Sequence, residues 1–179
     1  MLRVSFRAGS TGLWRVERLA AVRGEPLRSA ERLDVVEGEW ASADGAAWVL
    51  RGVTSNDRYT MGAEREALRA RQEPLGRPEA TRAALIPVRK SDAWWELSQD
   101  QRRAIFEERS HHIAVGLEYL PAVARRLHHG RDLGEPFDFL TWFEYRPGAA
   151  AAFEELVGRL RETEEWRYVE READIRLSR

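Results

Sequence analysis

The chain has 179 residues, of which 43% are hydrophobic and 33% charged, and its formal net charge is −1. These values are ordinary for a globular protein, and the interleaved charges exclude a basic stripe for nucleic acid or an anionic membrane. The absence of cysteine excludes disulfides, thiolate zinc sites and a cysteine nucleophile. The first residues lack the apolar run of a secretory signal, and no later stretch is long enough to span a membrane, so we expect a cytoplasmic protein.

The first half of the chain is strand-like and rich in turn residues. Residues 2–7 alternate between apolar and polar side chains, residues 12–19 follow as a hairpin partner, and residues 46–53 predict another strand. The stretch 24–33 is too broken by Gly, Pro and charge for an assignment. Residues 61–71 are rich in Ala, Glu and Arg and predict a short helix, which the Pro and Gly that follow bring to an end.

Strand signals are clearer in the second half. Residues 83–88, 137–145 and 166–177 each predict a strand, the second of them densely aromatic. Charged residues alternate with apolar ones after Thr163, which indicates a strand with one solvated face.

Two helical regions lie between these strands. Ser98 and Gln101 have the spacing of a capping box, so a helix begins there and runs towards Gly116. The helix is expected to restart around Pro121, a residue tolerated in a first turn, and to end near Gly130. Residues 149–161 carry apolar side chains at helical spacing. The order of elements predicts an α+β fold with helices over one face of a mostly antiparallel sheet.

Only four histidines occur, as the adjacent pairs His111-His112 and His128-His129. Neighbours on a helix point about a quarter-turn apart, so one member of each pair faces a given site. His112 is seven residues after Ile105, on the same helical face, and is expected to look inward. Three interpretations stay open: a structural histidine, a member of a four-histidine metal cluster, or the axial ligand of a haem iron.

An axial histidine needs an acceptor for its other ring N–H. The acidic residues that qualify are Glu107, Glu108, Glu118, Glu144 and the pair Glu164-Glu165. Adjacent arginines such as Arg125-Arg126 are typical of a solvated helix face. Of the pair Trp94-Trp95, one member is expected to line a pocket or a subunit contact, because both cannot face one core.

Several motifs resemble those of chlorite dismutases, a family of haem enzymes. The haem-binding segment of that family is similar to residues 110–121 (SHHIAVGLEYLP) followed by 124–127 (ARRL). Further similarity lies in 137–144 (FDFLTWFE), in the Trp pair and in 164–169 (EEWRYV), so the resemblance spans roughly residues 85–177. Residues 52–60 extend it more weakly.

The resemblance implies roles for the residues nearest the iron of haem b. The family's proximal histidine stands five residues before a Leu-x-Tyr-Leu motif, which corresponds to His112. The distal arginine stands thirteen residues after that histidine, which corresponds to Arg125. Glu165 corresponds to the acidic residue that hydrogen-bonds the proximal imidazole, with Glu164 next if the register slips.

Further haem contacts follow from the same resemblance. Lys90 corresponds to a lysine that forms a salt bridge with a haem propionate, and Trp94 lies beside a propionate. Asn56 and Tyr59 occupy a stretch that resembles further propionate contacts.

Two residues resemble the distal side of the family's compact members, which are usually dimeric. Gln72 is similar to their distal glutamine, and Leu120 to the apolar wall over the iron. The implied fold is a pair of ferredoxin-like halves that share a β-barrel, with a reduced half over 1–80 and a haem-binding half over 81–179. We therefore expect a homodimer.

The implied activity is the conversion of chlorite to chloride and dioxygen, with Arg125 holding the anion at the iron. One alternative is a lyase like the coproheme decarboxylases, which are long, pentameric and lack the distal arginine. A second is a haem-binding or haem-sensing protein without catalysis, and a third is a peroxidase of low activity.

Overall fold

The computed structural model describes residues 1–54 and 60–179, so the predicted propionate contacts Asn56 and Tyr59 lie outside the described residues. The described strands are β1 (Arg3–Gly9), β2 (Trp14–Arg23), β3 (Arg32–Glu37), β4 (Trp48–Val53), β5 (Arg82–Lys90), β6 (Val123–His129), β7 (Phe139–Tyr145) and β8 (Val169–Ser178). The α-helices are α1 (Gly62–Arg71), α2 (Asp92–Glu96), α3 (Gln99–Arg103), α4 (His112–Glu118) and α5 (Ala150–Arg161). Shorter segments are the π-helical η1 (Ala104–Arg109) and the 3-10 turns η2 (Arg131–Leu133), η3 (Pro147–Ala149) and η4 (Glu164–Tyr168).

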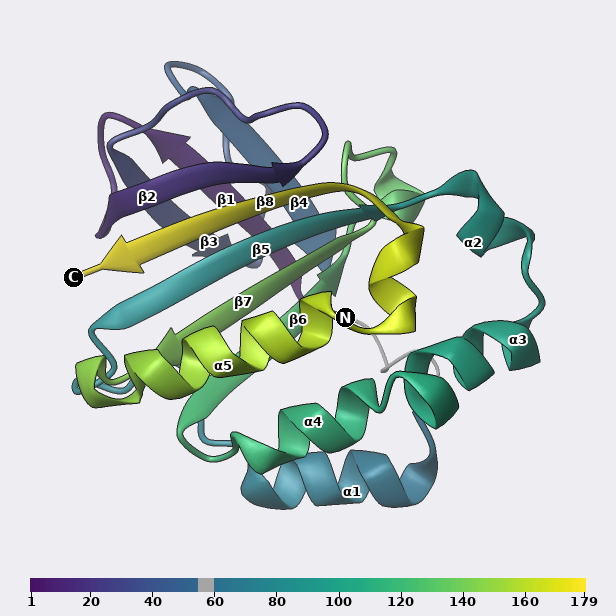
Figure 1. Cartoon of the computed structure of the whole chain (residues 1–179). Coiled ribbons are helices and arrows are strands. Elements are labelled where there is room, and N and C mark those ends of the chain that lie inside the picture. The colour runs from purple at the N-terminus through teal and green to yellow at the C-terminus, as the bar shows by residue number, and fades with distance from the viewer. Residues whose placement is uncertain (55–59) are drawn as a thin grey trace.

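The strands form one closed antiparallel barrel in the order β1-β3-β2-β8-β5-β7-β6-β4. Strand β8 comes after all the others in the sequence, yet it lies between β2 and β5 and so joins the strands of the two halves of the chain. Figure 1 shows β1 to β4 on one side of this strand and β5 to β7 on the other. The predicted α+β class and shared barrel are confirmed.

The barrel interior is filled by every second side chain of its strands. On β8 these are Ala173, Ile175 and Leu177, which belong to one core with Phe6 of β1 and Trp142 of β7. The rings of Phe6 and Trp142 lie 5.6 Å apart. Because side chains alternate along a strand, the remaining positions of β5, β7 and β8 face outward.

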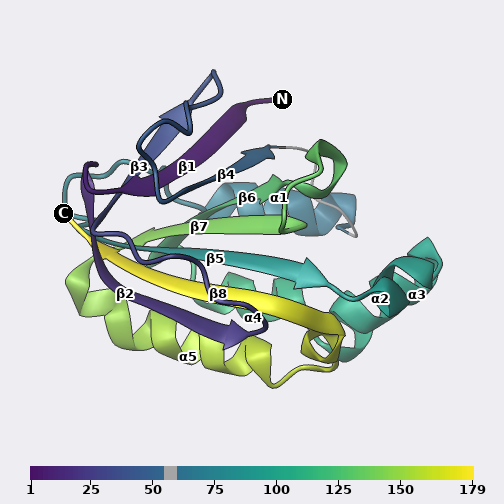
Figure 2. The same ribbon diagram turned by 90° about the horizontal axis from the view of Figure 1, so that it is seen from above.

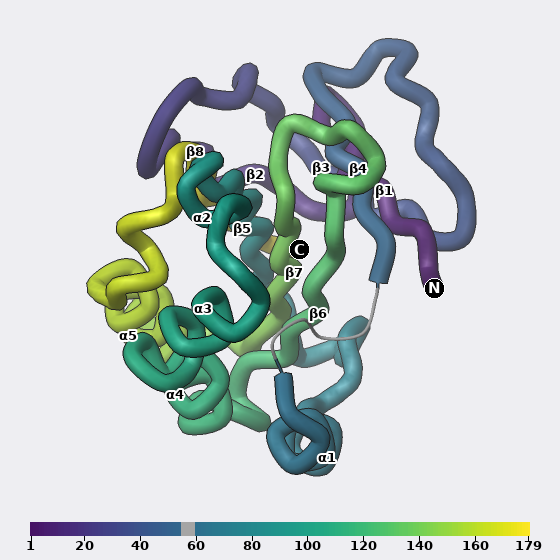
Figure 3. The backbone as a smooth tube through the Cα atoms, turned by 90° about the vertical axis from the view of Figure 1, so that its right-hand side faces the viewer, coloured from purple at the N-terminus to yellow at the C-terminus, as the bar shows by residue number. Residues whose placement is uncertain are grey.

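Helix α5 covers much of this outer face. Its Phe153, Leu156 and Val157 pack on outward residues such as Ile86 of β5 and Phe143 of β7. Figure 2 shows α4 and α5 on the same side of the strands β5 and β8, and Figure 3 shows α3, α4 and α5 together outside the barrel. None of the helices in the described ranges is long and apolar enough to cross a membrane.

The helix expected over residues 121–130 is wrong, because this segment is strand β6. It pairs along its length with β7, from Val123 opposite Tyr145 to His129 opposite Phe139. This long-range pairing with an aromatic strand outweighs the local helical preference of Ala, Arg and Leu. Strand β3 follows the unassigned stretch 24–33 and was likewise not predicted.

The helix that begins at Ser98 is broken before Gly116. The Ser98 backbone N–H donates to Gln101 Oε1 at 2.9 Å, as the capping box predicts. Helix α3 then passes into the π-helical η1, and His111 adopts a left-handed conformation with φ of 52°. As a result α4 starts anew at His112, which lies at a helix N-terminus and not inside one long helix.

The predicted solvated face of β8 is also wrong. Its outward charges are buried under α5: Glu172 and Asp174 are each 1% exposed and Arg176 is 8% exposed. Arg161 of α5 reaches both carboxylates. Alternation on β8 therefore separates an apolar barrel face from a buried ionic face. The polarity of the residues does not reveal whether such a charged face is buried or solvated.

Candidate functional site

A pocket lies between the outer face of the sheet and the helical segments η1 and α4. Its space, including the open mouth, is about 1230 Å³. Apolar side chains make up most of the wall: Ile86, Val88, Trp94, Phe106, Ile113, Leu120, Val123, Leu127, Phe139, Phe143, Leu156, Val157, Leu160 and Trp166. Polar side chains are few, and they include Lys90, His112, Arg125 and Glu165.

His112 forms a connected group at one side of this pocket with Glu165 and Lys90, of which Glu165 and Lys90 are buried and His112 is partly exposed. The Nδ1–H of His112 donates to Glu165 Oε2 at 2.6 Å, and Lys90 Nζ donates to Glu165 Oε1 at 2.7 Å. Burial alone would raise the pKa of Glu165, but the charge of Lys90 and the hydrogen bonds from His112 and Lys90 hold that pKa at about 2. The carboxylate is therefore ionised, and it fixes the tautomer that leaves Nε2 of His112 for a ligand.

Local contacts set the position of His112 at the start of α4. Glu107, which is buried, accepts hydrogen bonds from the backbone N–H groups of Ile113 at 2.6 Å and Ala114 at 3.2 Å. These donors belong to the first turn, where backbone N–H groups have no partner within the helix. Ser110, just ahead of α4, links this segment to Glu165, because its Oγ accepts a hydrogen bond from the backbone N–H of Glu165 at 3.0 Å.

Aromatic rings surround the imidazole and the ammonium group. The rings of Phe106 and Trp166 stack with His112 at centroid distances of 4.4 Å and 6.4 Å. Lys90 Nζ lies 4.6 Å from the Trp94 ring and 5.5 Å from the Trp166 ring. Ring faces attract a cation, so these contacts support a charged lysine in a dry environment.

Arg125 and Leu120 line the same pocket from other elements. Arg125 projects outward from β6, while Leu120 comes from the turn after α4. Gln72 meets the backbone of Arg125, since its Nε2 donates to the Arg125 carbonyl at 2.6 Å. Its side chain lines a neighbouring cavity to which Arg125 also contributes.

In the structure Lys90 pairs with Glu165. The residue is 4% exposed and its ammonium group is bonded to Glu165, so Lys90 lies on the histidine side of the pocket, and its contact with a haem propionate stays a prediction. Trp94 lines the pocket as expected of one member of the Trp pair. The second member, Trp95, stacks on Phe139 and lies 4.0 Å from the guanidinium carbon of Arg131.

The sequence pattern alone left several glutamates open as the acceptor for His112, and the resemblance implied Glu165. The geometry selects Glu165. Sequence reasoning did not identify Ser110, Trp166 or the capping role of Glu107. Each of these depends on contacts that short-range patterns do not encode. The one local signal was the position of Glu107 ahead of the apolar run 113–117, which is consistent with a helix cap.

These residues fit a haem. A flat macrocycle needs an apolar pocket, and iron needs an imidazole nitrogen backed by an acceptor. The pocket supplies the apolar walls, His112 supplies the nitrogen, and Glu165 is the acceptor. The fit rests on this donor set and on the apolar lining of the pocket.

Comparisons with known proteins agree with this geometry. The family model described as chlorite dismutase matches residues 32–179. A curated chlorite dismutase from Ideonella dechloratans is 39% identical over 62 residues, which cover 35% of this chain and only 20% of that relative's length.

Among solved structures, the dimeric chlorite dismutase from Nitrobacter winogradskyi has 58% sequence identity and a TM-score of 0.92, and the match covers 98% of this chain and 99% of that one. A mutant chlorite dismutase from Candidatus Nitrospira defluvii has 19% identity and a TM-score of 0.71 over 99% of this chain and 91% of that one, which shows the shared fold alone. On the family match and the structural match together, this chain belongs to the chlorite dismutase family.

Proposed function

We propose that this chain is a haem b enzyme that converts chlorite to chloride and dioxygen. The observation that carries the proposal is the hydrogen-bonded His112–Glu165–Lys90 group in an apolar pocket that Arg125 also lines. The two relatives named chlorite dismutase support the same activity.

His112 is the residue that holds the cofactor in this proposal. Its Nε2 binds the iron, while Glu165 keeps the proton on Nδ1 and makes the imidazole a stronger donor. Haem iron supplies oxygen-atom transfer when it is bound. Lys90 balances the charge of Glu165 inside the pocket, so the carboxylate stays ionised without solvent.

Arg125 is the residue that handles the substrate. A guanidinium carries a permanent positive charge and five donors, so it binds the chlorite anion without the loss of a proton. Overall, one chlorite anion gives one chloride anion and one dioxygen molecule, so a single negative charge is present from substrate to product. Arg125 would hold that charge in the pocket, including any hypochlorite formed on the way, and the apolar walls, which include Leu120, would strengthen its hold.

The test is oxygen evolution from chlorite by the haem-loaded chain. The matched variants are His112→Ala and His111→Ala, because His111 is adjacent to His112 and exposed. We expect His112→Ala to lose the haem Soret band and oxygen evolution, while His111→Ala keeps both. Haem binding without any oxygen from the unaltered chain would instead support a haem-binding protein.

We also propose that the chain is a homodimer, as the name of the Nitrobacter winogradskyi structure says of that protein. Light scattering of the haem-loaded chain gives the mass directly. A monomer or a pentamer would refute this assignment.

A further inference from the structure

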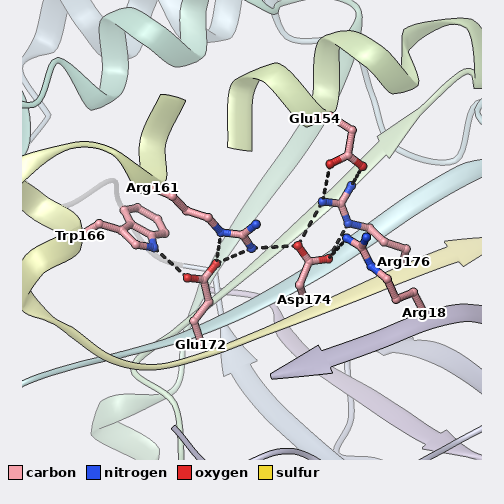
Figure 4. Close-up of polar contacts among 7 residues, drawn as sticks. All are labelled: Arg18, Glu154, Arg161, Trp166, Glu172, Asp174 and Arg176. Carbon is pink, nitrogen blue, oxygen red and sulfur yellow. Dashed lines mark hydrogen bonds and ion pairs between the residues drawn. The ribbon is translucent and has the colours of Figure 1, made fainter. Parts of the chain in front are cut away.

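The buried ionic face of β8 continues from the site along α5. Arg161 Nη2 donates to Glu172 Oε1 at 2.6 Å and to Asp174 Oδ2 at 2.8 Å. Arg176 bonds the other side of Asp174 and also Glu154. Figure 4 shows these contacts in a row, with Trp166 at one end and Glu154 at the other.

The central charges of this network lie away from water, since Glu172 and Asp174 are each 1% exposed, whereas Glu154 at its outer end is 59% exposed. Burial would raise the pKa of Asp174, but its hydrogen bonds with Arg176 and Arg161 hold that pKa at about 2. The transfer of such charges out of water has a desolvation penalty, which apolar side chains of similar size do not have. The network is therefore not there for stability alone, and its hydrogen bonds fix the geometry of the groups that they join.

Trp166 is the group that this geometry fixes at the site. Its single donor, Nε1–H, donates to Glu172 Oε2 at 2.8 Å, while Arg161 occupies Oε1 of the same carboxylate. The indole ring is thereby anchored at its edge. Its face stacks with His112 at an interplanar angle of 22° and lies 5.5 Å from Lys90 Nζ.

We propose that Trp166 is a positioning residue for His112, and that Glu172 and Arg161 hold it in place. The ring limits the rotation of the imidazole and shields the hydrogen bond between His112 and Glu165 from water. The buried network thus sets how firmly the proximal histidine is held. This inference rests on the proposed function in one respect, which is that His112 binds the haem iron.

Two leucine substitutions compare opposite ends of the network, the buried Glu172 and the exposed Glu154. Glu172→Leu removes the acceptor of Trp166 and leaves Arg161 bonded to Asp174. Glu154→Leu removes the other terminal carboxylate and leaves Arg176 bonded to Asp174. Only the first substitution touches Trp166. Trp166→Phe keeps an aromatic ring but cannot donate to Glu172, so it tests the same link without loss of the buried carboxylate.

The first measurement needs no haem. In the full chain, the His112 Nδ1–H proton is expected as a downfield proton resonance, because it donates to a carboxylate at 2.6 Å. We expect Glu172→Leu and Trp166→Phe to broaden this resonance or shift it upfield, and Glu154→Leu to leave it in place. In the haem-loaded chain, the first two variants should lose haem about tenfold faster. The double variant with Glu172→Leu and Trp166→Phe should lose haem no faster than the more affected single variant, because both substitutions break the same hydrogen bond.

Several results would overturn the inference. One is an unchanged resonance and haem-loss rate in Trp166→Phe, which decides the matter even if Glu172→Leu does not fold. Another is an equal effect of Glu154→Leu and Glu172→Leu. Oxygen evolution enters neither measurement. A chain that binds haem but evolves no oxygen would refute the proposed function alone, whereas variants without effect in an active chain would refute this inference alone.

Discussion

Arg125 and Arg126 are neighbours in the sequence, yet they lie on opposite faces of β6. Arg125 faces the pocket with Leu127 and His129. Arg126 faces the other way, where its Nε donates to His128 Nε2 at 3.0 Å and its Nη2 pairs with Glu37. Strand alternation therefore gives the site one arginine and provides a control in the next residue.

Arg125→Ala is expected to keep haem but to lower chlorite turnover by roughly 10- to 100-fold, the worth of one charge-assisted hydrogen bond. Part of the activity survives because His112 and its partners are untouched. Escaped hypochlorite should bleach the haem within fewer turnovers, so a hypochlorite scavenger protects this variant more than the unaltered chain. Arg126→Ala is the control, and oxygen yield with haem absorbance is the measurement. Equal rates and bleaching in both variants would contradict the assignment.

Glu165→Gln is expected to raise the ferric/ferrous potential. A neutral amide is a weaker acceptor for Nδ1–H, so the imidazole donates less electron density to the iron. Glu164→Gln is the matched control, because Glu164 pairs with Arg109 at 3.0 Å and does not bond His112. Spectroelectrochemical titration measures both potentials. The same potential in Glu165→Gln and the unaltered chain would rule out this role.

Glu107→Ala is expected to destabilise the start of α4. The carboxylate caps the N–H groups of Ile113 and Ala114, and loss of such a cap lowers the free energy of unfolding by about 1–2 kcal/mol. The neighbouring Glu108 is exposed, so Glu108→Ala should change that free energy by less than about 0.5 kcal/mol. Chemical denaturation of the haem-free chain compares the two. Equal stability of both variants would show that the cap contributes nothing.

His128 makes the stability of the fold depend on pH. It is fully buried, and burial lowers its pKa from 6.5 to about 4. Both ring nitrogens are used in the neutral form, since Nδ1–H donates to the Leu140 carbonyl and Nε2 accepts from Arg126.

The unfolded chain binds this proton near pH 6.5 and the folded chain near pH 4. The free energy of unfolding therefore falls as the pH decreases between these values, by on the order of 3 kcal/mol in total. His128→Gln keeps a donor and an acceptor but does not titrate, so it should flatten this slope. His111→Gln, at an exposed position, should not. Denaturation of the haem-free chain from pH 7.5 to pH 4 gives the slopes, and parallel curves for all three proteins would contradict the prediction.

Much of the fold follows from local patterns, and the failures share one cause. Strands such as β5 and β7 and helix α5 were predicted because their periodicity agrees with their environment. The segment of β6 was predicted as a helix because Ala, Arg and Leu favour helices, and only its partner β7 makes it a strand. The charges of β8 looked solvated because two of their partners, Arg161 and Glu154, lie on α5.

The site was predictable only in part for the same reason. The resemblance to chlorite dismutases implied His112, Arg125 and Glu165, and the structure brings all three to one pocket. The ion pair of Lys90 with Glu165, at 2.7 Å, was not foreseen, because it joins segments that are far apart in the sequence. Trp166 and Ser110 were missed because their roles arise from contacts between segments that are far apart in the sequence.

The place of β8 between β2 and β5 determines when the site is completed during synthesis. Until β8 leaves the ribosome, β2 and β5 each have an unpaired edge, which is a surface prone to association with other chains. Glu165 lies just ahead of this strand, so a nascent chain that already displays His112 still lacks its hydrogen-bond partner. In the proposed haem enzyme, stable capture of the cofactor would therefore follow insertion of β8, and cofactor loading would report that this strand is in place.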